Sequence, residues 1–305
     1  MVSVVIPTLN AGPSLRPLLE SLRRQTVPLE IVVVDSSSDD GTPEVAATSG
    51  AKVVTVPRED FDHGGTRNLG VRSASGDIIV FATQDIMPAD EYAVERLISP
   101  FAADERIGVS YGRQVPCPGA TPFAAHIRLF NYPEASCTRS LEDGGRGIKV
   151  PFLSNSFAAY RRTALQAIGY FREKLISTED TYAGAKMLLA GFRIAYAADA
   201  VVYHSHNYTP GEEFKRYFDI GVFHRKERWI METFGRAEGE GRRFLRSELL
   251  YLLQNGKYHL LPEFFVRNVL KYVGFTLGRH YDRLPPLILK KISKNINFWT
   301  KSQGA

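Results

Sequence analysis

The stretch Ile31-Val-Val-Val-Asp35-Ser-Ser-Ser-Asp-Asp-Gly41 decides the fold of this chain. Its apolar half predicts a strand buried on both faces, and its polar half predicts a loop. Similar strand signals lie at Val2–Ile6, Val53–Val56 and Ile78–Ala82. Leucines at helical spacing separate the first two strands. Strands that alternate with helices predict an α/β fold with a mostly parallel sheet.

Polar side chains follow three of these strands. Thr8 and Asn10, then Asp35, then Gln84 and Asp85 come just after strand ends, where ligands of such sheets collect. Asp35 can accept a hydrogen bond from a base or a ribose, or it can cap a helix as an ordinary turn residue. Asp85 can hold a divalent metal that bridges two phosphates, or it can be another turn aspartate. Taken singly, each residue leaves both interpretations open.

The motif Phe61-Asp-His-Gly-Gly-Thr-Arg67-Asn68 is dense in unusual residues. Its two glycines permit a ligand to approach the backbone closely, and the N-terminus of the helix that they open favours anions. Arg67 can pair with phosphate oxygens in a fork. The alternative is a glycine turn with a surface arginine, but the density of the motif favours a function.

Two further candidates lie in the second half of the chain. Glu179 and Asp180 begin a predicted helix, where a carboxylate can act as a general base on a hydroxyl or simply stabilise the first turn. His204 and His206 follow a predicted strand and would point to opposite faces if the strand continued. We therefore expect only one of them to complete a metal site with Asp85.

Composition excludes several classes of protein. The chain has 305 residues, 44% of them hydrophobic and 23% charged, which is typical of a globular protein with about two domains. There is no apolar run long enough to span a membrane and no signal-peptide pattern, and two cysteines make no disulfide framework, so a cytoplasmic protein is expected. Residues 1–100 carry 8 Lys and Arg against 14 Asp and Glu, which does not suit a nucleic-acid binder.

The C-terminal part is basic and predicted to be helical. Residues 205–305 carry 18 Lys and Arg against 10 Asp and Glu. Between Phe265 and Leu277 apolar residues recur at helical spacing, with Arg267 and Lys271 among them. Such a helix can lie on an anionic membrane with its apolar face down, or it can pack on the catalytic domain or on a second subunit as a homodimer.

Together these motifs resemble a family-2 glycosyltransferase with the GT-A nucleotide-sugar-binding fold. The Val-Ser-Val-Val-Ile-Pro-Thr-Leu-Asn10 start, the Asp35 loop, Gln84-Asp85 and Glu179-Asp180 occur in the family's order. The stretch from Phe61, with Asn155-Ser-Phe-Ala-Ala-Tyr-Arg-Arg-Thr-Ala164, is most similar to rhamnosyltransferases that build bacterial surface polysaccharide such as O-antigen from dTDP-rhamnose. The resemblance covers residues 2–210 and implies a catalytic domain over 1–210 and a helical, basic region over 211–305.

The resemblance implies a role for each candidate residue. Thr8 and Asn10 would line the nucleotide pocket with Gln84, Asp35 would bind the pyrimidine base, and Arg67 would lie near the diphosphate. Asp85 and His204 would hold Mg²⁺ or Mn²⁺, although Thr83 replaces the first aspartate of the family's Asp-X-Asp motif. Asp180 would deprotonate the acceptor hydroxyl while Glu179 orients the acceptor, which is a glycan or a lipid-linked glycan.

Three other functions compete with this one. A family-2 transferase that uses a UDP-sugar would share every motif. A sugar-1-phosphate nucleotidyltransferase would need a glycine-rich, arginine-containing loop after the first strand, where this chain has Pro7-Thr-Leu-Asn-Ala-Gly-Pro13. A non-catalytic glycan- or membrane-binding module would not need Asp35, Asp85 and Asp180 together. The sequence therefore favours an inverting, metal-dependent sugar transferase that works in the cytoplasm or on the inner face of the membrane.

Overall fold

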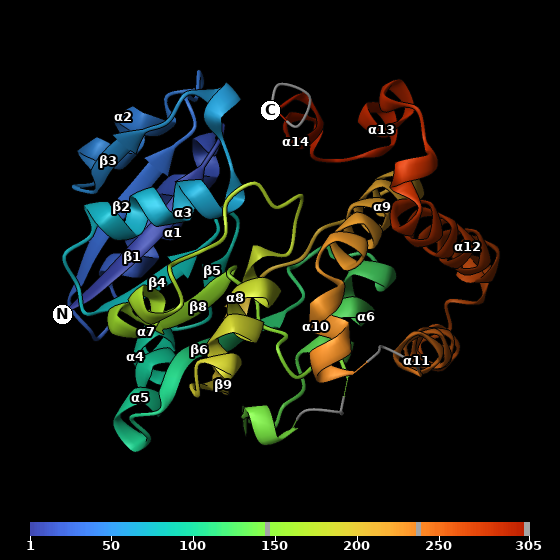
Figure 1. The fold of residues 1–305 in the computed structure, drawn as a ribbon. Coiled ribbons are helices and arrows are strands. Elements are labelled where there is room, and N and C mark those ends of the chain that lie inside the picture. Colours follow the sequence, from blue (N-terminus) through green and yellow to red (C-terminus); the bar gives the residue numbers. More distant parts are fainter. Residues whose placement is uncertain (144–146, 236–238, 302–305) are drawn as a thin grey trace.

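The computed structural model describes residues 1–143, 147–235 and 239–301. These residues form one nine-stranded sheet in the order β3-β2-β1-β4-β8-β6-β9-β5, with β7 paired to β9 (Figure 1). Neighbours among β1 to β4 run parallel, β6 and β9 run parallel, and β8 runs antiparallel to both β4 and β6. The predicted α/β class is confirmed. The strands are β1 (Val2–Thr8), β2 (Leu29–Asp35), β3 (Lys52–Thr55), β4 (Ile78–Ala82), β5 (Met87–Pro88), β6 (Ile107–Val115), β7 (Cys137–Arg139), β8 (Phe157–Arg161) and β9 (Arg193–Tyr203).

Two strand predictions are corrected. β1 continues through Pro7 to Thr8. Past Val5 it pairs with β2 on one side but no longer with β4 on the other. Proline lacks a backbone N–H, and this loss is tolerated where one side of a strand is unpaired. The sequence pattern predicts two strands, at Arg193–Tyr196 and Ala200–Tyr203, but the structure has a single strand there, β9. Its pairing with β6 slips between Gly112 and Arg113, so the weak signal in the middle of β9 marks an irregularity rather than a turn.

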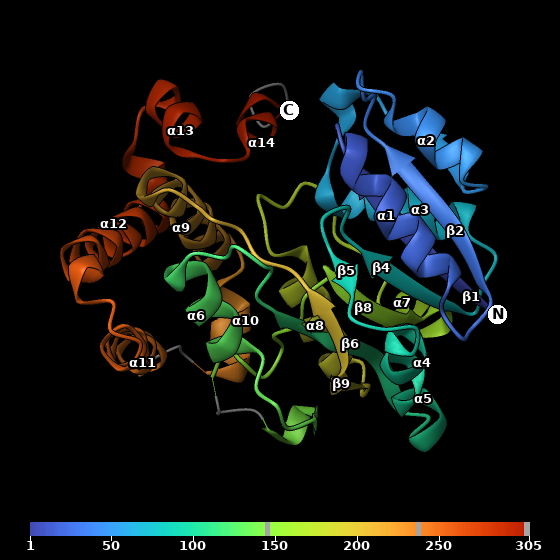
Figure 2. The same ribbon diagram turned by 180° about the vertical axis from the view of Figure 1, so that it is seen from behind.

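Helices cover both faces of the sheet. Figures 1 and 2 show α1 on one face and α3 on the other. Alternate residues of β1 accordingly enter different cores: Val4 and Ile6 pack with the α1 side, and Val5 packs with the α3 side. The helices up to the end of the sheet are α1 (Gly12–Arg23), α2 (Thr42–Thr48), α3 (His63–Ser73), α4 (Ala93–Ile98), α5 (Pro100–Ala103), α6 (Pro122–Asn131), α7 (Arg162–Ala167) and α8 (Glu179–Leu189), with 3₁₀ turns η1 (Arg58–Asp60) and η2 (Leu141–Asp143).

The described chain after β9 is helical. α9 starts with a capping box in which Thr209 and Glu212 satisfy each other's backbone N–H groups. α9 and α12 pack so closely that a Cβ on Gly278 would lie 2.1 Å from the carbonyl oxygen of Phe218. The division of domains at residue 210 remains a proposal. The elements are α9 (Pro210–Lys226), α10 (Arg228–Phe234), α11 (Glu240–Gln254), η3 (Tyr258–Leu260), α12 (Leu261–Arg279), η4 (Tyr281–Arg283), α13 (Pro286–Ile292) and α14 (Ile296–Lys301).

Two basic residues in the middle of α12, Arg267 and Lys271, face inward, which corrects the sequence-based picture of this helix. Arg267 and Lys271 are buried and pair with Glu213 at 3.2 and 3.6 Å. The opposite face is apolar and exposed, with Val269 60% and Tyr272 72% accessible. Ion pairs thus join α12 to Glu213 of α9, while apolar side chains of α12 are exposed to solvent. Within the described residues, every helix is too short or too polar to cross a membrane.

The last described segment, residues 293–301, folds back onto earlier parts of the chain. Asn297 Nδ2 donates to the carbonyl oxygen of Arg58 at 3.4 Å, and Asn295 Nδ2 donates to that of Ile176 at 2.6 Å. Both figures show α14 approaching the N-terminal elements. Trp299 is buried in the same core as residues of the sheet. The C-terminal helices therefore contribute directly to the surroundings of the site.

Candidate functional site

The carboxyl ends of β1 and β2 are joined by side chains. Thr8 Oγ1 donates to Asp35 Oδ1 at 2.9 Å, and the Ser38 hydroxyl donates to the same oxygen at 2.6 Å. The Ser38 backbone N–H donates to Asp35 Oδ2 at 2.8 Å. Asp35 is fully buried. These contacts fix the carboxylate at the sheet edge, and its contact with a base remains a prediction.

The adjoining loops are held in unusual backbone conformations. Asn10 and Ser37 have φ angles of 47° and 55°, in the left-handed region that costs about 1–3 kcal/mol for such residues. Strain of this kind collects at ligand sites. Gln84 clamps the first loop, since it accepts from the Leu9 N–H at 2.8 Å and donates to the Leu9 carbonyl at 3.1 Å. Gln84 thereby connects the Thr8–Asn10 turn with Asp85.

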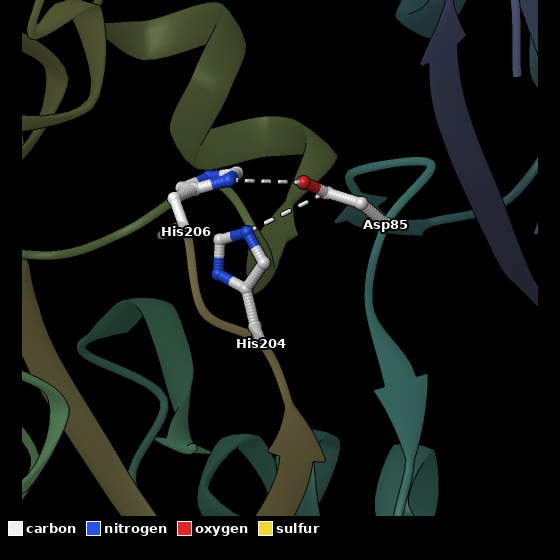
Figure 3. Close-up of side chains that lie close together, drawn as sticks. All are labelled: Asp85, His204 and His206. Atoms are coloured by element: carbon white, nitrogen blue, oxygen red, sulfur yellow. Dashed lines mark ion pairs between the residues drawn. The ribbon is translucent and has the colours of Figure 1, made fainter. Parts of the chain in front are cut away.

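Asp85, His204 and His206 form a cluster (Figure 3). Their ligand atoms all lie within 4.8 Å of one another. His204 Nε2 is 3.4 Å from Asp85 Oδ1, and His206 Nδ1 is 3.6 Å from Asp85 Oδ2. Both imidazoles point at the same carboxylate, which corrects the expectation that only one would. β9 ends at Tyr203, so the alternation of a strand does not apply to residues 204–206.

The electrostatics of this cluster suit a cation. Burial lowers the pKa of His204, and burial with the adjacent His204 lowers the pKa of His206 to about 4. Burial of Asp85 opposes ionisation, but the two histidines hold its pKa well below the usual value. At neutral pH the cluster consists of one carboxylate and two neutral imidazoles, and these are metal-ligand groups.

One atom of the cluster lacks a partner. His204 Nε2 is buried and has no hydrogen-bond partner among the described residues. The other ring nitrogen, Nδ1, lies 2.8 Å from Gln114 Oε1, which can only accept and therefore fixes the proton on Nδ1. The lone pair of Nε2 then faces Asp85. Residues with this donor set fit a divalent transition metal.

Asp180 begins α8 and reaches a half-buried position. The residue before Glu179, Thr178, has a φ of 59°, which is strained for a β-branched side chain, and its side chain does not cap the helix. Burial raises the pKa of Asp180 to about 7, and the neighbouring Glu179 carboxylate adds to this rise. A carboxylate with such a pKa can accept a proton near neutral pH.

Glu179 is not suited to accept a proton near neutral pH as Asp180 is. Its carboxylate is buried and lies 3.1 Å from Arg67 Nη1, and Asn155 Nδ2 donates to it at 3.3 Å. Burial alone would raise the pKa of Glu179, but the Arg67 guanidinium and the other neighbours hold it below the ordinary value. The ion pair neutralises Arg67, and a contact of Arg67 with the diphosphate remains a prediction, as does an orienting role of Glu179.

The glycine motif, which forms the start of α3, supports the segment that leads to Asp180. A Cβ on Gly64 would lie 2.2 Å from the carbonyl oxygen of Arg172, so the close approach here is to this segment rather than to a ligand. Asn68 makes two hydrogen bonds to the backbone of Phe171, at 2.9 and 3.0 Å. Asp62 caps α3 and also accepts from the Lys174 N–H at 2.9 Å. The motif therefore fixes the backbone of the segment that leads to Asp180.

A short loop, residues 154–156, contacts residues around the Asp85, His204 and His206 cluster and also the Glu179–Asp180 segment. Gln114, which contacts His204, also donates to Ser154 Oγ at 2.9 Å. Asn155 contacts Glu179, and the carbonyl oxygen of Ser156 accepts from the Thr83 N–H at 3.2 Å. Among the described residues no direct contact joins Asp85 to Asp180.

Sequence reasoning missed three residues of the site. His206 joins the cluster, Gln114 fixes the tautomer of His204, and Asn155 holds Glu179. The available signals were weak: His204-Ser-His206 is a spaced histidine pair, and Gln114 is a polar residue within an apolar strand. Neither signal specifies a partner without the fold.

The fold and the site together define the class: this is a glycosyltransferase with the GT-A fold. The chain belongs to glycosyl transferase family 2, whose sequence model matches residues 3–169. It is 42% identical over 306 residues to the O-antigen chain rhamnosyltransferase RfbN of Salmonella typhimurium, covering 99% of this chain and 97% of the relative. It is 40% identical to the O-antigen chain rhamnosyltransferase WbaN of Salmonella anatum, covering 99% and 96%.

Solved structures share the fold at low sequence identity. A mannosyltransferase of Pyrobaculum calidifontis, in complex with GDP-mannose and Mn²⁺, superimposes with a TM-score of 0.64 at 18% identity, covering 93% of this chain and 88% of that one. Residues 1–349 of TarS from S. aureus, in complex with UDP-GlcNAc, give a TM-score of 0.56 at 22% identity, covering 99% and 92%. Both similarities extend into the helical C-terminal region and support the GT-A assignment.

Proposed function

We propose that this enzyme transfers L-rhamnose from dTDP-rhamnose to a hydroxyl of a glycan or lipid-linked acceptor, with inversion, in the synthesis of a bacterial surface polysaccharide. The observation that carries the chemistry is Asp180, a half-buried carboxylate whose pKa is raised to about 7. The choice of rhamnose rests on the two Salmonella relatives, which carry the name rhamnosyltransferase and match nearly the whole chain.

The proposed reaction is a single displacement. Asp180 accepts the proton of the acceptor hydroxyl as its oxygen forms a bond to the anomeric carbon of the donor. The bond from that carbon to the diphosphate breaks on the opposite face, and its electron pair leaves with the nucleotide. Attack on the face opposite the leaving group inverts the anomeric centre. Arg67 and Asn155 hold Glu179 in place, so that its charge keeps Asp180 basic enough to take the proton.

Asp85, His204 and His206 would hold the divalent cation. When bound, it would supply positive charge to stabilise the diphosphate leaving group. Two imidazole nitrogens favour a transition metal over Mg²⁺, which prefers oxygen ligands, so we propose Mn²⁺. Gln114 supports this choice because it presents the unprotonated nitrogen of His204 to the cation.

We also propose that the exposed apolar face of α12 contacts the cytoplasmic surface of an anionic membrane. This face includes Phe265, Val266, Val269 and Tyr272, each more than half exposed. Exposed bases follow in the chain, among them Arg279, Arg283 and Lys291. A lipid-linked acceptor would be presented at such a surface. Burial of this face in a homodimer is the alternative, and the two differ in their need for lipid.

A panel of nucleotide sugars tests the donor. Thermal unfolding is followed with Mn²⁺ and dTDP-rhamnose, UDP-GlcNAc or GDP-mannose, since a ligand that binds only the folded state raises Tm. We expect the largest rise with dTDP-rhamnose, and slow release of dTDP when the mixture is left without acceptor. Stabilisation by a UDP-sugar alone would make the protein a UDP-sugar transferase, and no turnover of any sugar would contradict the catalytic proposal.

A further inference from the structure

Two cations lie against one aromatic ring beside the Asp85, His204 and His206 cluster, and a third is held next to the cluster itself. Lys294 Nζ lies 4.0 Å from the centre of the Tyr208 ring, and the Arg216 guanidinium carbon lies 5.7 Å from it. Arg216 Nη1 is also 3.5 Å from the Tyr208 hydroxyl. The His206 ring stacks on Tyr208 with centres 5.0 Å apart. Tyr208 therefore joins the metal-type cluster to these basic groups.

Arg128 brings the third positive charge. Its Nε–H donates to the carbonyl oxygen of His204 at 2.8 Å, so its guanidinium is fixed next to the cluster. The two terminal amino groups make no hydrogen bond to the described part of the chain. Burial lowers the pKa of Arg128, and repulsion from Arg216 acts in the same direction. The two guanidinium groups therefore repel each other electrostatically.

The positive charge of these groups is not neutralised locally. Across residues 1–143, 147–235 and 239–301, no carboxylate forms an ion pair with Arg128, Arg216 or Lys294. Asp85, Glu212 and Asp219 act on these cations through longer-range electrostatics, without an ion pair to their side chains. The buried cations of the described chain, by contrast, are paired with carboxylates, as Arg67 is with Glu179. Like charges that lie close together repel, and an anion bound between them would replace this repulsion with attraction.

The fold builds this arrangement from three separate segments. Arg128 lies on α6, Arg216 lies on α9, and Lys294 lies between α13 and α14. The last is anchored by Asp219, whose Oδ2 accepts from the Lys294 N–H at 3.0 Å and whose Oδ1 accepts from the Ser293 hydroxyl at 2.6 Å. The convergence therefore depends on specific contacts and is not the accident of one basic helix.

We propose that Arg128, Arg216 and Lys294 form a phosphate-binding subsite next to Asp85, His204 and His206, and that its ligand is a diphosphate. Guanidinium groups bind phosphate oxygens in a fork, and the lysine adds a mobile point charge. The inference rests on the proposed transferase function, in which a diphosphate is available from two sources. One is the leaving nucleotide, and the other is the diphosphate of a lipid-linked acceptor.

The first arm of the test measures dTDP. Arg216→Gln and Lys294→Gln are made in the full chain, where both residues are exposed, and retention of the fold is checked by the Tm. Arg72→Gln, which removes the same charge from an exposed position at the end of α3, is the matched control. With Mn²⁺ present, we expect each subsite variant to weaken dTDP binding about tenfold by calorimetry, and thymidine binding to be unaffected.

The second arm measures geranyl diphosphate, a short lipid diphosphate, in the presence of saturating dTDP and Mn²⁺. If the acceptor supplies the phosphate, the variants bind dTDP normally and lose about tenfold in affinity for geranyl diphosphate. Unchanged binding of both ligands overturns the subsite. Sugar transfer by the unmodified enzyme is assayed separately: loss of diphosphate affinity without any transfer would refute the transferase and keep the subsite.

Discussion

Arg67 on α3 and Glu179 on α8 form an ion pair of 3.1 Å in which both side chains are about 8% exposed. The pair joins the glycine motif to the residue next to Asp180. Arg67, from the first half of the chain, therefore contributes to the charge around Asp180 in the second half.

Replacing one partner of this pair should lower the free energy of unfolding more than replacing both partners does. Arg67→Met leaves the Glu179 carboxylate buried without its counter-charge, which typically costs about 3–5 kcal/mol. We expect Arg67→Met combined with Glu179→Gln to recover much of that loss in urea unfolding. Arg243→Met, which breaks the more exposed pair with Glu240, should cost less than about 1 kcal/mol. Equal losses in the single and double variants would show that the pair is not coupled.

The pH dependence of activity should report on Asp180. Because the base must be deprotonated and its pKa is raised to about 7, kcat/KM should rise with pH up to about 7 and then level off. Glu179→Gln removes the like charge and leaves the positive Arg67, so the rise should move to lower pH by about one unit or more. A rise at the same pH in the variant would show that Glu179 does not tune the base.

Asp180→Asn should abolish sugar transfer and keep dTDP binding. The same change should also alter stability with a defined sign. A carboxyl whose pKa is raised on folding stabilises the protein below its unfolded value of about 4, and this contribution is lost as the pH rises towards 7. Asp180→Asn should therefore raise the Tm at pH 8 and change it little at pH 4. A uniform decrease at both pH values would contradict the raised pKa, and retained turnover would remove Asp180 from the role of base.

The tautomer of His204 should control metal affinity. Gln114→Leu keeps the volume but removes the acceptor that fixes the proton on Nδ1, and such changes typically cost about 10–100-fold in metal affinity. The Mn²⁺ concentration for half-maximal activity should rise accordingly, and chelation should inactivate the enzyme. His259→Ala, at an exposed histidine of η3, is the control. An unchanged Mn²⁺ requirement in Gln114→Leu would separate Gln114 from the metal site.

The outer face of α12 should determine membrane binding. Val269→Glu places a charge in the exposed apolar face and should greatly reduce flotation with vesicles that contain anionic phospholipid. Leu141→Ser, at an exposed leucine of η2, should float as the unmodified protein does. If the unmodified protein fails to float and instead elutes as a dimer that Val269→Glu disrupts, the face is a subunit interface.

The sequence by itself determined the α/β class, the strand that ends at Asp35, and the placement of Thr8, Asp35 and Asp85 at strand ends. The spacing of hydrophobic residues and the residue types that form turns are local properties of the sequence, which is why these features could be predicted. It also placed Asp180 at the start of a helix. The tertiary structure decided which charged and ionisable side chains contact one another. It paired Arg67 with Glu179, turned Arg267 and Lys271 inward, and brought both His204 and His206 to Asp85. These outcomes depend on contacts between segments up to more than a hundred residues apart, and no local pattern records which distant side chain will occupy a given position.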